Sequence, residues 1–292
     1  MPPEITLLTS PGWKDYALLD TGAGRKLERF GGYTFVRPEA QAIWRPALPG
    51  KAWDGADGEY HATGDEGHGK WEMARSIAPW QMRYGKLVME AQAGGSRHLG
   101  VFPEQAAHWD WMAEKVRSAG RPIRVLNLFG YTGLASLAVA QAGAAVTHVD
   151  ASKKAVAWGQ KNQQLSGLGD RPIRWLVDDV EKFVRREMRR GSKYDGLILD
   201  PPKFGRGPSG EVWEFFEAMT DLLANCKSLL SDQPLFIVLT AYAIRASALS
   251  IRYALEGMVK DLGGTLEAGE LALAEESAGR LLSMAIFGRW GG

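Results

Sequence analysis

The middle of the chain holds residue types that could bind a nucleoside, placed where predicted apolar strands end. The motif NLFGYTG covers residues 127–133, at the end of one such strand and the start of a helix. In parallel sheets, ligands bind at the carboxyl ends of the strands, where glycine lets the backbone approach them closely. Gly130 and Gly133 could equally form a tight turn that only packs the helix on the sheet, because their spacing is not that of a dinucleotide-binding fingerprint.

Two acidic segments follow the next strands along the chain. Asp150 ends the segment AVTHVD, where a carboxylate can accept hydrogen bonds from the two hydroxyls of a ribose. The alternative role, a helix cap, suits Ser152 better. Residues 178–180, Asp-Asp-Val, follow IRWLV and could meet an adenine amino group. For Asp178 we favour an acidic residue that stabilises a helix N-terminus.

The motif LDPPKF, residues 199–204, follows a fully apolar strand. Its two prolines remove N–H donors and stiffen the loop, so that carbonyl oxygens and the Asp200 carboxylate face the ligand crevice. Such a rigid set of acceptors suits an amine donor such as the exocyclic amino group of a nucleobase, and Phe204 could stack on the base. The plainer alternative is a proline turn that only ends the strand.

Alternating strands and helices are predicted to position these motifs. A helix from Pro103 to about Gly120 is followed by strands at 123–129, 145–150, 173–177, 194–200 and 234–240 and by helices at 134–142, 152–167, 180–190, 211–230 and 246–260. Two late strands, 265–273 and 281–288, are expected to form an antiparallel edge. This order predicts an α/β fold: a Rossmann-like, seven-stranded, mostly parallel sheet with helices on both faces.

The sequence pattern of residues 1–96 differs from that of the rest and predicts a smaller β-rich domain. Residues 97–292 are the second predicted domain. Seven of the 11 tryptophans lie in the first 111 residues. They could stack on bases in a substrate groove, but packing in a small β core is the use we favour. Residues 51–70, rich in glycine and acid, predict a long loop or mobile hairpin.

Composition narrows the classes of protein. A net charge of +1 and a pI near 7.8 exclude nucleic-acid binding through overall charge, so any RNA site must be a local patch. No secretory signal or membrane-spanning stretch is recognisable, which predicts a soluble cytoplasmic protein without a membrane partner. The five histidines lack metal-ligand spacing, so no metal site is expected. The oligomeric state stays open.

In this order and spacing, NLFGYTG, VDAS, VDDV and LDPPKF resemble the motifs of class I S-adenosylmethionine-dependent methyltransferases, most closely the branch that modifies bases of large-subunit ribosomal RNA, the cytosine-5 type. The resemblance covers about residues 97–290 and implies S-adenosylmethionine as cofactor. By this resemblance, residues 129–133 would hold the methionine part of the cofactor and Asp150 would bind its ribose. Asp179 and Val180 would contact adenine, and Asp200 would face both the methyl group and the substrate. The implied cofactor residues are Phe102, Gln105, Asn127, Phe129, Gly130, Tyr131, Thr132, Gly133, Asp150, Ser152, Asp179, Val180 and Asp200, of which Phe102 and Gln105 belong to the upstream segment HLGVFPEQ.

The sequence departs from this branch at one chemically important place. Members that methylate cytosine C5 carry a cysteine after the strand that follows the DPP loop, because C5 becomes nucleophilic only when a thiolate adds to C6. Ala241 and Tyr242 stand there, and the single cysteine, Cys226, belongs to an apolar helical stripe. The branch's usual N-terminal RNA-binding module also has no match in residues 1–95.

The sequence therefore predicts transfer of a methyl group to an RNA base, with ribosomal RNA as partner and a nitrogen as acceptor. Asp200, Pro201, Lys203 and Phe204 are the predicted catalytic residues. Four alternatives stay open: a cytosine-5 RNA methyltransferase, a protein side-chain methyltransferase, an RNA-binding module that keeps the cofactor without turnover, and a nicotinamide oxidoreductase. The missing third-glycine spacing and the DPPKF loop count against the last.

Overall fold

The computed structural model describes residues 3–10, 12–63 and 69–292, which form two compact units. We call them the α/β unit (Met1–Leu8, Ala107–Leu271 and Met284–Gly292) and the β-rich unit (Thr9–Ala106 and Ala272–Ser283). The two units divide between Ala106 and Ala107, whereas the sequence predicts a boundary between residues 96 and 97. The two last strands, 10 and 11 residues long, also reach beyond the α/β unit, so that the turn between them belongs to the β-rich unit.

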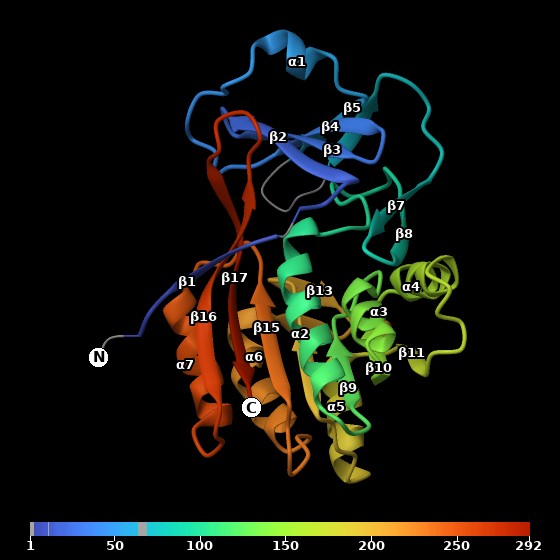
Figure 1. Cartoon of the computed structure of the whole chain (residues 1–292), viewed down its shortest axis with the longest axis vertical. Coiled ribbons are helices and arrows are strands. Elements are labelled where there is room, and N and C mark those ends of the chain that lie inside the picture. The colour runs from blue at the N-terminus through green and yellow to red at the C-terminus, as the bar shows by residue number, and fades with distance from the viewer. Residues whose placement is uncertain (1–2, 11, 64–68) are drawn as a thin grey trace. The chain divides into compact units, whose positions relative to one another are not determined.

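The α/β unit is built on an eight-stranded sheet in the order β1-β16-β17-β15-β12-β9-β10-β11 (Figure 1). Neighbouring strands from β15 to β11 run parallel, and β17 pairs antiparallel with β15. The predicted mostly parallel α/β sheet is confirmed, with one strand more than expected. The extra strand is β1, whose four residues are too few to give a recognisable pattern. The strands are β1 (Thr6–Thr9), β9 (Arg124–Leu128), β10 (Ala145–Asp150), β11 (Ile173–Val177), β12 (Gly196–Leu199), β15 (Phe236–Ala241), β16 (Thr265–Ala274) and β17 (Leu281–Gly291).

Helices cover both faces of this sheet because successive strand side chains point to opposite sides. On β15, Phe236 meets Trp111 of α2, whereas Ile237 enters the hydrophobic core shared with α5, α6 and α7. The first face carries α2 (Ala106–Ser118), α3 (Leu134–Gln141) and α4 (Lys153–Leu165). The second carries α5 (Val180–Arg189), α6 (Phe215–Lys227) and α7 (Ala248–Val259).

The helix expected from residue 211 begins only at Phe215. Residues Val212–Glu214 instead form β14, which pairs antiparallel with β13 (Phe204–Arg206). The predicted apolar stripe is correspondingly shorter. Cys226 is fully buried on it as expected, but Val212 and Phe216 are 57% and 55% exposed.

The β-rich unit contains a five-stranded sheet in the order β2-β3-β4-β5-β6 and a separate pair, β7-β8. Its tryptophans pack as favoured from the sequence: Trp71 and Trp80 both contact Phe35, and Trp53 is buried. The predicted loop at 51–70 instead contains most of α1, all of β5 and the start of β6, while residues 64–68 lie outside the described part. The elements are β2 (Tyr16–Gly22), β3 (Arg25–Phe30), β4 (Tyr33–Pro38), α1 (Gly50–Asp54), β5 (Gly58–Ala62), β6 (Gly69–Met73), β7 (Trp80–Tyr84), β8 (Leu87–Ala91) and η1 (Pro103–Gln105).

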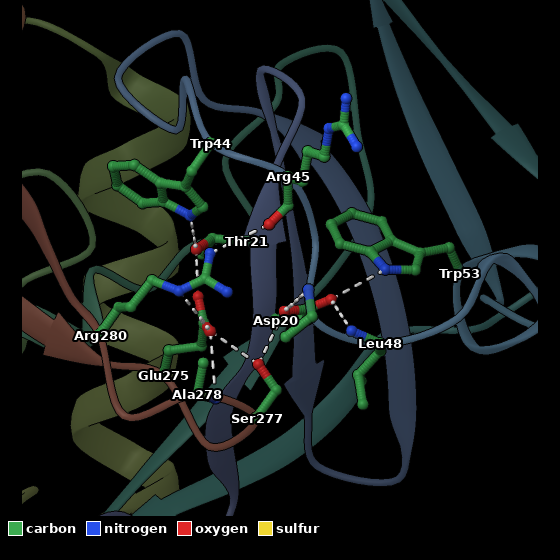
Figure 2. A network of polar contacts seen from close by, with 11 residues as sticks. Asp20, Thr21, Trp44, Arg45, Leu48, Trp53, Glu275, Ser277, Ala278 and Arg280 are labelled. Carbon is green, nitrogen blue, oxygen red and sulfur yellow. Dashed lines mark hydrogen bonds and ion pairs between the residues drawn. The ribbon is translucent and has the colours of Figure 1, made fainter.

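A buried carboxylate fixes the turn between β16 and β17 inside the β-rich unit (Figure 2). The turn lies along β2, where Ser277 N donates to Leu19 O over 3.1 Å. Asp20 accepts hydrogen bonds from Ser277 Oγ at 2.7 Å, Leu48 N at 2.8 Å and Trp53 Nε1 at 3.1 Å. Burial by itself would raise the pKa of Asp20, but these hydrogen bonds hold it below its usual value.

His108 on α2 is fully buried against Phe287, with ring centroids 5.0 Å apart. Within the described part of the chain, neither ring nitrogen has a hydrogen-bond partner. Burial lowers the pKa of His108 to about 3, so its ring is neutral in the folded protein.

The pKa of His108 predicts a loss of stability in mild acid. In the unfolded chain a histidine titrates near pH 6.5, so the stabilisation from the neutral buried ring is complete above that pH and is lost as the pH falls toward 3. Between pH 7 and pH 5, this residue should lower the free energy of unfolding by about 2 kcal/mol. The free energy of unfolding of His108→Leu should therefore fall by about 2 kcal/mol less than that of the wild type between the two pH values. Urea unfolding at pH 7 and at pH 5 measures both changes. Equal losses in the two proteins would contradict the assignment.

Candidate functional site

The predicted nucleoside-binding motifs meet at one edge of the sheet, because their strands end at the same level. Leu128 of β9 is paired with Val149 of β10 on one side and with Leu199 of β12 on the other. Beyond them, Asp150 is in register with Val177 of β11. The turn after β9, Asp150, the acidic segment after β11 and the DPP loop after β12 therefore leave neighbouring strands side by side.

The turn at 129–133 has an unusual backbone. Phe129 and Tyr131 adopt left-handed φ values of 57° and 49°, as does Gly133 at 80°. Non-glycine residues rarely adopt this conformation, and its cost of about 1 kcal/mol or more must be met by surrounding contacts. Two backbone hydrogen bonds supply such contacts: Gly130 N donates to Val149 O over 3.1 Å, and Gly133 N donates to Gly130 O over 3.0 Å.

The glycines of this turn are required by packing beneath it. A Cβ atom at Gly130 would lie 2.3 Å from the imidazole ring of His148, and one at Gly133 would lie 2.5 Å from the indole of Trp175. Those rings themselves are in contact, with centroids 4.4 Å apart. Packing of the turn on the sheet, which the sequence left as an alternative, thus accounts for both glycines.

Asp150 ties the turn to the end of β10. Its carboxylate accepts hydrogen bonds from Tyr131 N and Ser152 N, each over 2.8 Å and each on a different oxygen. Burial raises the pKa of Asp150, and these two hydrogen bonds oppose the rise. Since each carboxylate oxygen has two lone pairs, one on each oxygen is still available for a further donor. Two adjacent hydroxyls are the donors that such a pair of acceptors suits.

Asn127 lies under the turn instead of at the strand ends. It is 1% exposed, its Nδ2 donates to Ser136 Oγ over 2.8 Å, and that hydroxyl is 3.0 Å from His148 Nδ1. Burial lowers the pKa of His148 to about 3, so this layer is uncharged. The cofactor role predicted for Asn127 stays a prediction, while its amide nitrogen is bonded to Ser136 beneath the turn. A histidine between the apolar residues of β10 was the sequence signal for this supporting layer.

Two other predicted cofactor residues cap helices. Ser152 Oγ accepts from Ala155 N at the start of α4, over 3.2 Å. Asp179 Oδ1 accepts from Lys182 N at the start of α5, over 2.9 Å. The acid that caps α5 is thus Asp179, whereas Asp178 pairs with Arg186. Val180 is buried in the core, with 4% of its surface exposed.

The DPP loop is held rigidly beside the turn. Asp200 N donates to Leu128 O over 3.4 Å, which joins the loop to the end of β9. Trp213 Nε1 donates to Pro202 O over 2.7 Å, and the Trp213 ring lies 4.8 Å from that of Phe129. Pro201 is buried, while Lys203 and Phe204 are exposed. The structure thus brings the predicted catalytic loop next to the predicted methionine-binding turn, and Trp213 is an anchor that the sequence did not reveal.

Phe102 and Gln105 belong to the β-rich unit, where Phe102 packs on His98 with ring centroids 4.7 Å apart. Their role in enclosing a cofactor stays a prediction. Among the described residues, no three His, Cys, Asp or Glu side chains are grouped as metal ligands, and no helix is long and apolar enough to cross a membrane.

Comparison with known proteins identifies the family. The family model described as S-adenosylmethionine-dependent methyltransferase matches residues 35–231, more than half of the chain. The chain belongs to this family of methyltransferases. A crystal structure titled as the SAM-dependent methyltransferase from Agrobacterium tumefaciens is 46% identical, with a TM-score of 0.93 over 98% of this chain and 93% of that one. A methyltransferase structure from Streptococcus mutans, 18% identical with a TM-score of 0.68 over 94% of this chain and 75% of that one, shares the fold.

Curated relatives of this methyltransferase match over shorter stretches. Ribosomal RNA large subunit methyltransferase I of Klebsiella pneumoniae (strain 342) is 39% identical over 136 residues, 46% of this chain and 32% of that protein. Ribosomal RNA large subunit methyltransferase K/L of Shewanella baltica (strain OS195) is 38% identical over 119 residues, 39% of this chain and 16% of that protein. The chain therefore matches a third or less of the length of these relatives.

The residues at the strand ends fit the cofactor of the methyltransferase family. S-adenosylmethionine carries a ribose diol, for which Asp150 keeps one acceptor site on each carboxylate oxygen. Residues 129–133 would hold its methionine part, and Asp179 and Val180 would border adenine. When bound, the cofactor supplies an electrophilic methyl group.

Asp150→Ala should weaken binding of S-adenosylhomocysteine at least about tenfold, because two ribose hydroxyls lose acceptors worth about 1–3 kcal/mol each. Asp150→Asn, which keeps one acceptor oxygen, should weaken binding less. Titration calorimetry measures both affinities, with the exposed Asp170→Ala as matched control and circular dichroism to confirm folding. Unchanged affinity in a folded Asp150→Ala protein would contradict the ribose assignment.

Proposed function

We propose that this methyltransferase transfers a methyl group to a nitrogen of an RNA base, and that ribosomal RNA is its substrate. The observation that carries the proposal is the rigid DPP loop beside the turn predicted to bind the methionine part, with Asp200 bonded through its N–H to the end of β9. The names of the curated relatives support ribosomal RNA as the substrate class. We also propose a cytoplasmic location, which a ribosomal RNA substrate supports.

The DPP loop supplies the positioning that an amine acceptor needs. Asp200 would accept a hydrogen bond from the amino group and so hold its nitrogen toward the methyl group. Pro201 and Pro202 stiffen the backbone, so that little reorganisation is needed at the moment of reaction. Lys203 would lie near the phosphate of the acceptor nucleotide, and the exposed Phe204 ring is available to stack on an RNA base beside it. Catalysis by these residues is chiefly alignment of the reactants.

The environment of the single thiol favours nitrogen over carbon C5 as acceptor. Cys226 is 0% exposed on α6, and burial raises its pKa to about 12, so no thiolate forms near neutral pH. The place at the end of β15 where cytosine-5 enzymes carry a cysteine holds Ala241, the last residue of the strand and 1% exposed, and then Tyr242. The residues here lack the nucleophile that C5 methylation requires.

The proposal is tested by supplying tritiated S-adenosylmethionine and ribosomal RNA from a strain that lacks this gene, followed by mass spectrometry of the labelled nucleosides. We expect one N-methylated nucleoside. Asp200→Ala should bind S-adenosylhomocysteine within about threefold of the wild type but label RNA about a hundredfold more slowly, because it loses a positioned electrostatic group. Label in protein would indicate a side-chain methyltransferase, and cofactor binding without transfer to either substrate would indicate a non-catalytic module. Either result contradicts the proposal.

Cys226→Ala should retain full activity, at a cost of about 1 kcal/mol in stability for the small buried cavity. The cytosine-5 alternative makes the opposite prediction, since its thiolate forms a covalent adduct with the base. The measurement is denaturing gel electrophoresis after incubation with RNA that contains 5-fluorocytidine. A stable complex with the wild type that disappears in Cys226→Ala would establish the cytosine-5 reaction.

A further inference from the structure

The hairpin formed by β13 and β14, residues 204–214, is anchored at its base to the DPP loop. Trp213 donates to Pro202 O over 2.7 Å, and Phe215 N donates to Lys203 O over 3.0 Å. These bonds join β14 and the residue after it to Pro202 and Lys203, from which β13 continues directly. The hairpin is thus a rigid continuation of the predicted catalytic loop.

The tip of the same hairpin is anchored to α5. Glu211 accepts from Ser209 N over 2.9 Å and forms an ion pair with Lys182 in the first turn of α5. A Cβ atom at Gly207 would lie 2.3 Å from a carboxylate oxygen of Glu211 and 3.0 Å from one of Asp179, so the tip packs closely at this helix end. The hairpin therefore spans from the DPP loop after β12 to the helix that follows β11, along the edge where the cofactor residues lie.

The two faces of the hairpin differ in chemistry. Residues directly opposite on antiparallel strands share a face, and the register pairs Gly205 with Trp213, Phe204 with Glu214, and Arg206 with Val212. Gly205 and Trp213 form the inner face, where Trp213 is 6% exposed. The outer face carries Phe204 and Val212, which are 55% and 57% exposed, together with Arg206 and Glu214.

We propose that the outer face of the 204–214 hairpin binds an unstacked nucleotide of the RNA substrate next to the methylated base, which makes single-stranded or looped RNA the substrate class. The inference rests on the proposed function. Exposed aromatic and aliphatic side chains beside a cation are the surface that accepts an unstacked base together with its phosphate. The anchors at both ends hold this surface in place before RNA arrives, which reduces the entropy cost of binding.

The charges on the hairpin indicate where the phosphate lies. Within the described part of the chain, Lys203 and Arg206 form no ion pair, whereas Lys182 and Arg186 on neighbouring α5 are both paired with acids. Glu214 stands opposite Phe204, so phosphates are expected at the Arg206 end of the face and the base on Phe204. A continuous duplex would not expose the face of a base to Phe204.

The test measures binding of a fluorescent twelve-nucleotide single-stranded RNA of mixed sequence, and of its duplex, by anisotropy with S-adenosylhomocysteine present. We expect tighter binding of the single strand. Phe204→Leu should weaken it about five- to a hundredfold, the range for loss of one stacked base. Arg206→Gln should weaken it and lower the salt slope by about 0.7, the value for one phosphate of a single strand. Arg117→Gln, which alters an exposed arginine on α2, and Arg189→Gln at the basic end of α5 serve as controls and should bind like the wild type.

The possible failures are distinguishable. If the wild type binds and methylates RNA but both hairpin variants bind with unchanged affinity, the hairpin proposal is overturned and the proposed function stands. The same holds if the wild type prefers the duplex. If the wild type neither binds nor methylates RNA, the proposed function fails and the hairpin proposal fails with it. Unchanged affinity for S-adenosylhomocysteine in each variant shows that the fold of the site is intact.

Discussion

The hydrogen bond from Tyr131 N to the Asp150 carboxylate, 2.8 Å long, joins the turn after β9 to the end of β10. Its partner on the other oxygen, from Ser152 N, fixes the same carboxylate at the start of α4. The bond from Tyr131 depends on the parallel register that aligns Leu128 with Val149, because a shift of one residue would carry Asp150 away from the turn, whereas the bond from Ser152 is local to the end of β10. The predicted cofactor site thus depends on strand register, which brings together the side chains at the strand ends.

Beneath this edge lies a buried layer that supports the turn after β9. Asn127, Ser136 and His148 form a buried, neutral chain of hydrogen bonds between β9, α3 and β10. The rings of His148 and Trp175 leave no room for a side chain at Gly130 or Gly133. The left-handed residues Phe129 and Tyr131 therefore lie on closely packed side chains. The contacts of this layer offset the cost of their backbone conformation.

The sequence was sufficient for the alternation of strands and helices and for the place of Asp150 and Asp200, because both follow from local patterns: apolar runs, and acids where those runs end. It was insufficient for contacts between residues distant along the chain. Asn127 looked like a ligand residue, yet its amide is used by Ser136. Residues 212–214 were predicted as helix, yet their pairing with Phe204–Arg206 makes them a strand. Strand β1 and the turn at 275–280 depend on tertiary pairing that no local pattern encodes.

A crystal structure with S-adenosylhomocysteine tests most directly the central claim, that strand register gathers the cofactor residues around Asp150. We expect both ribose hydroxyls to donate to the Asp150 carboxylate, with the bonds from Tyr131 N and Ser152 N retained. The methionine part should lie along residues 129–133. A ribose bound elsewhere, or a carboxylate that leaves Tyr131 N to bind the ligand, would contradict this account of the site.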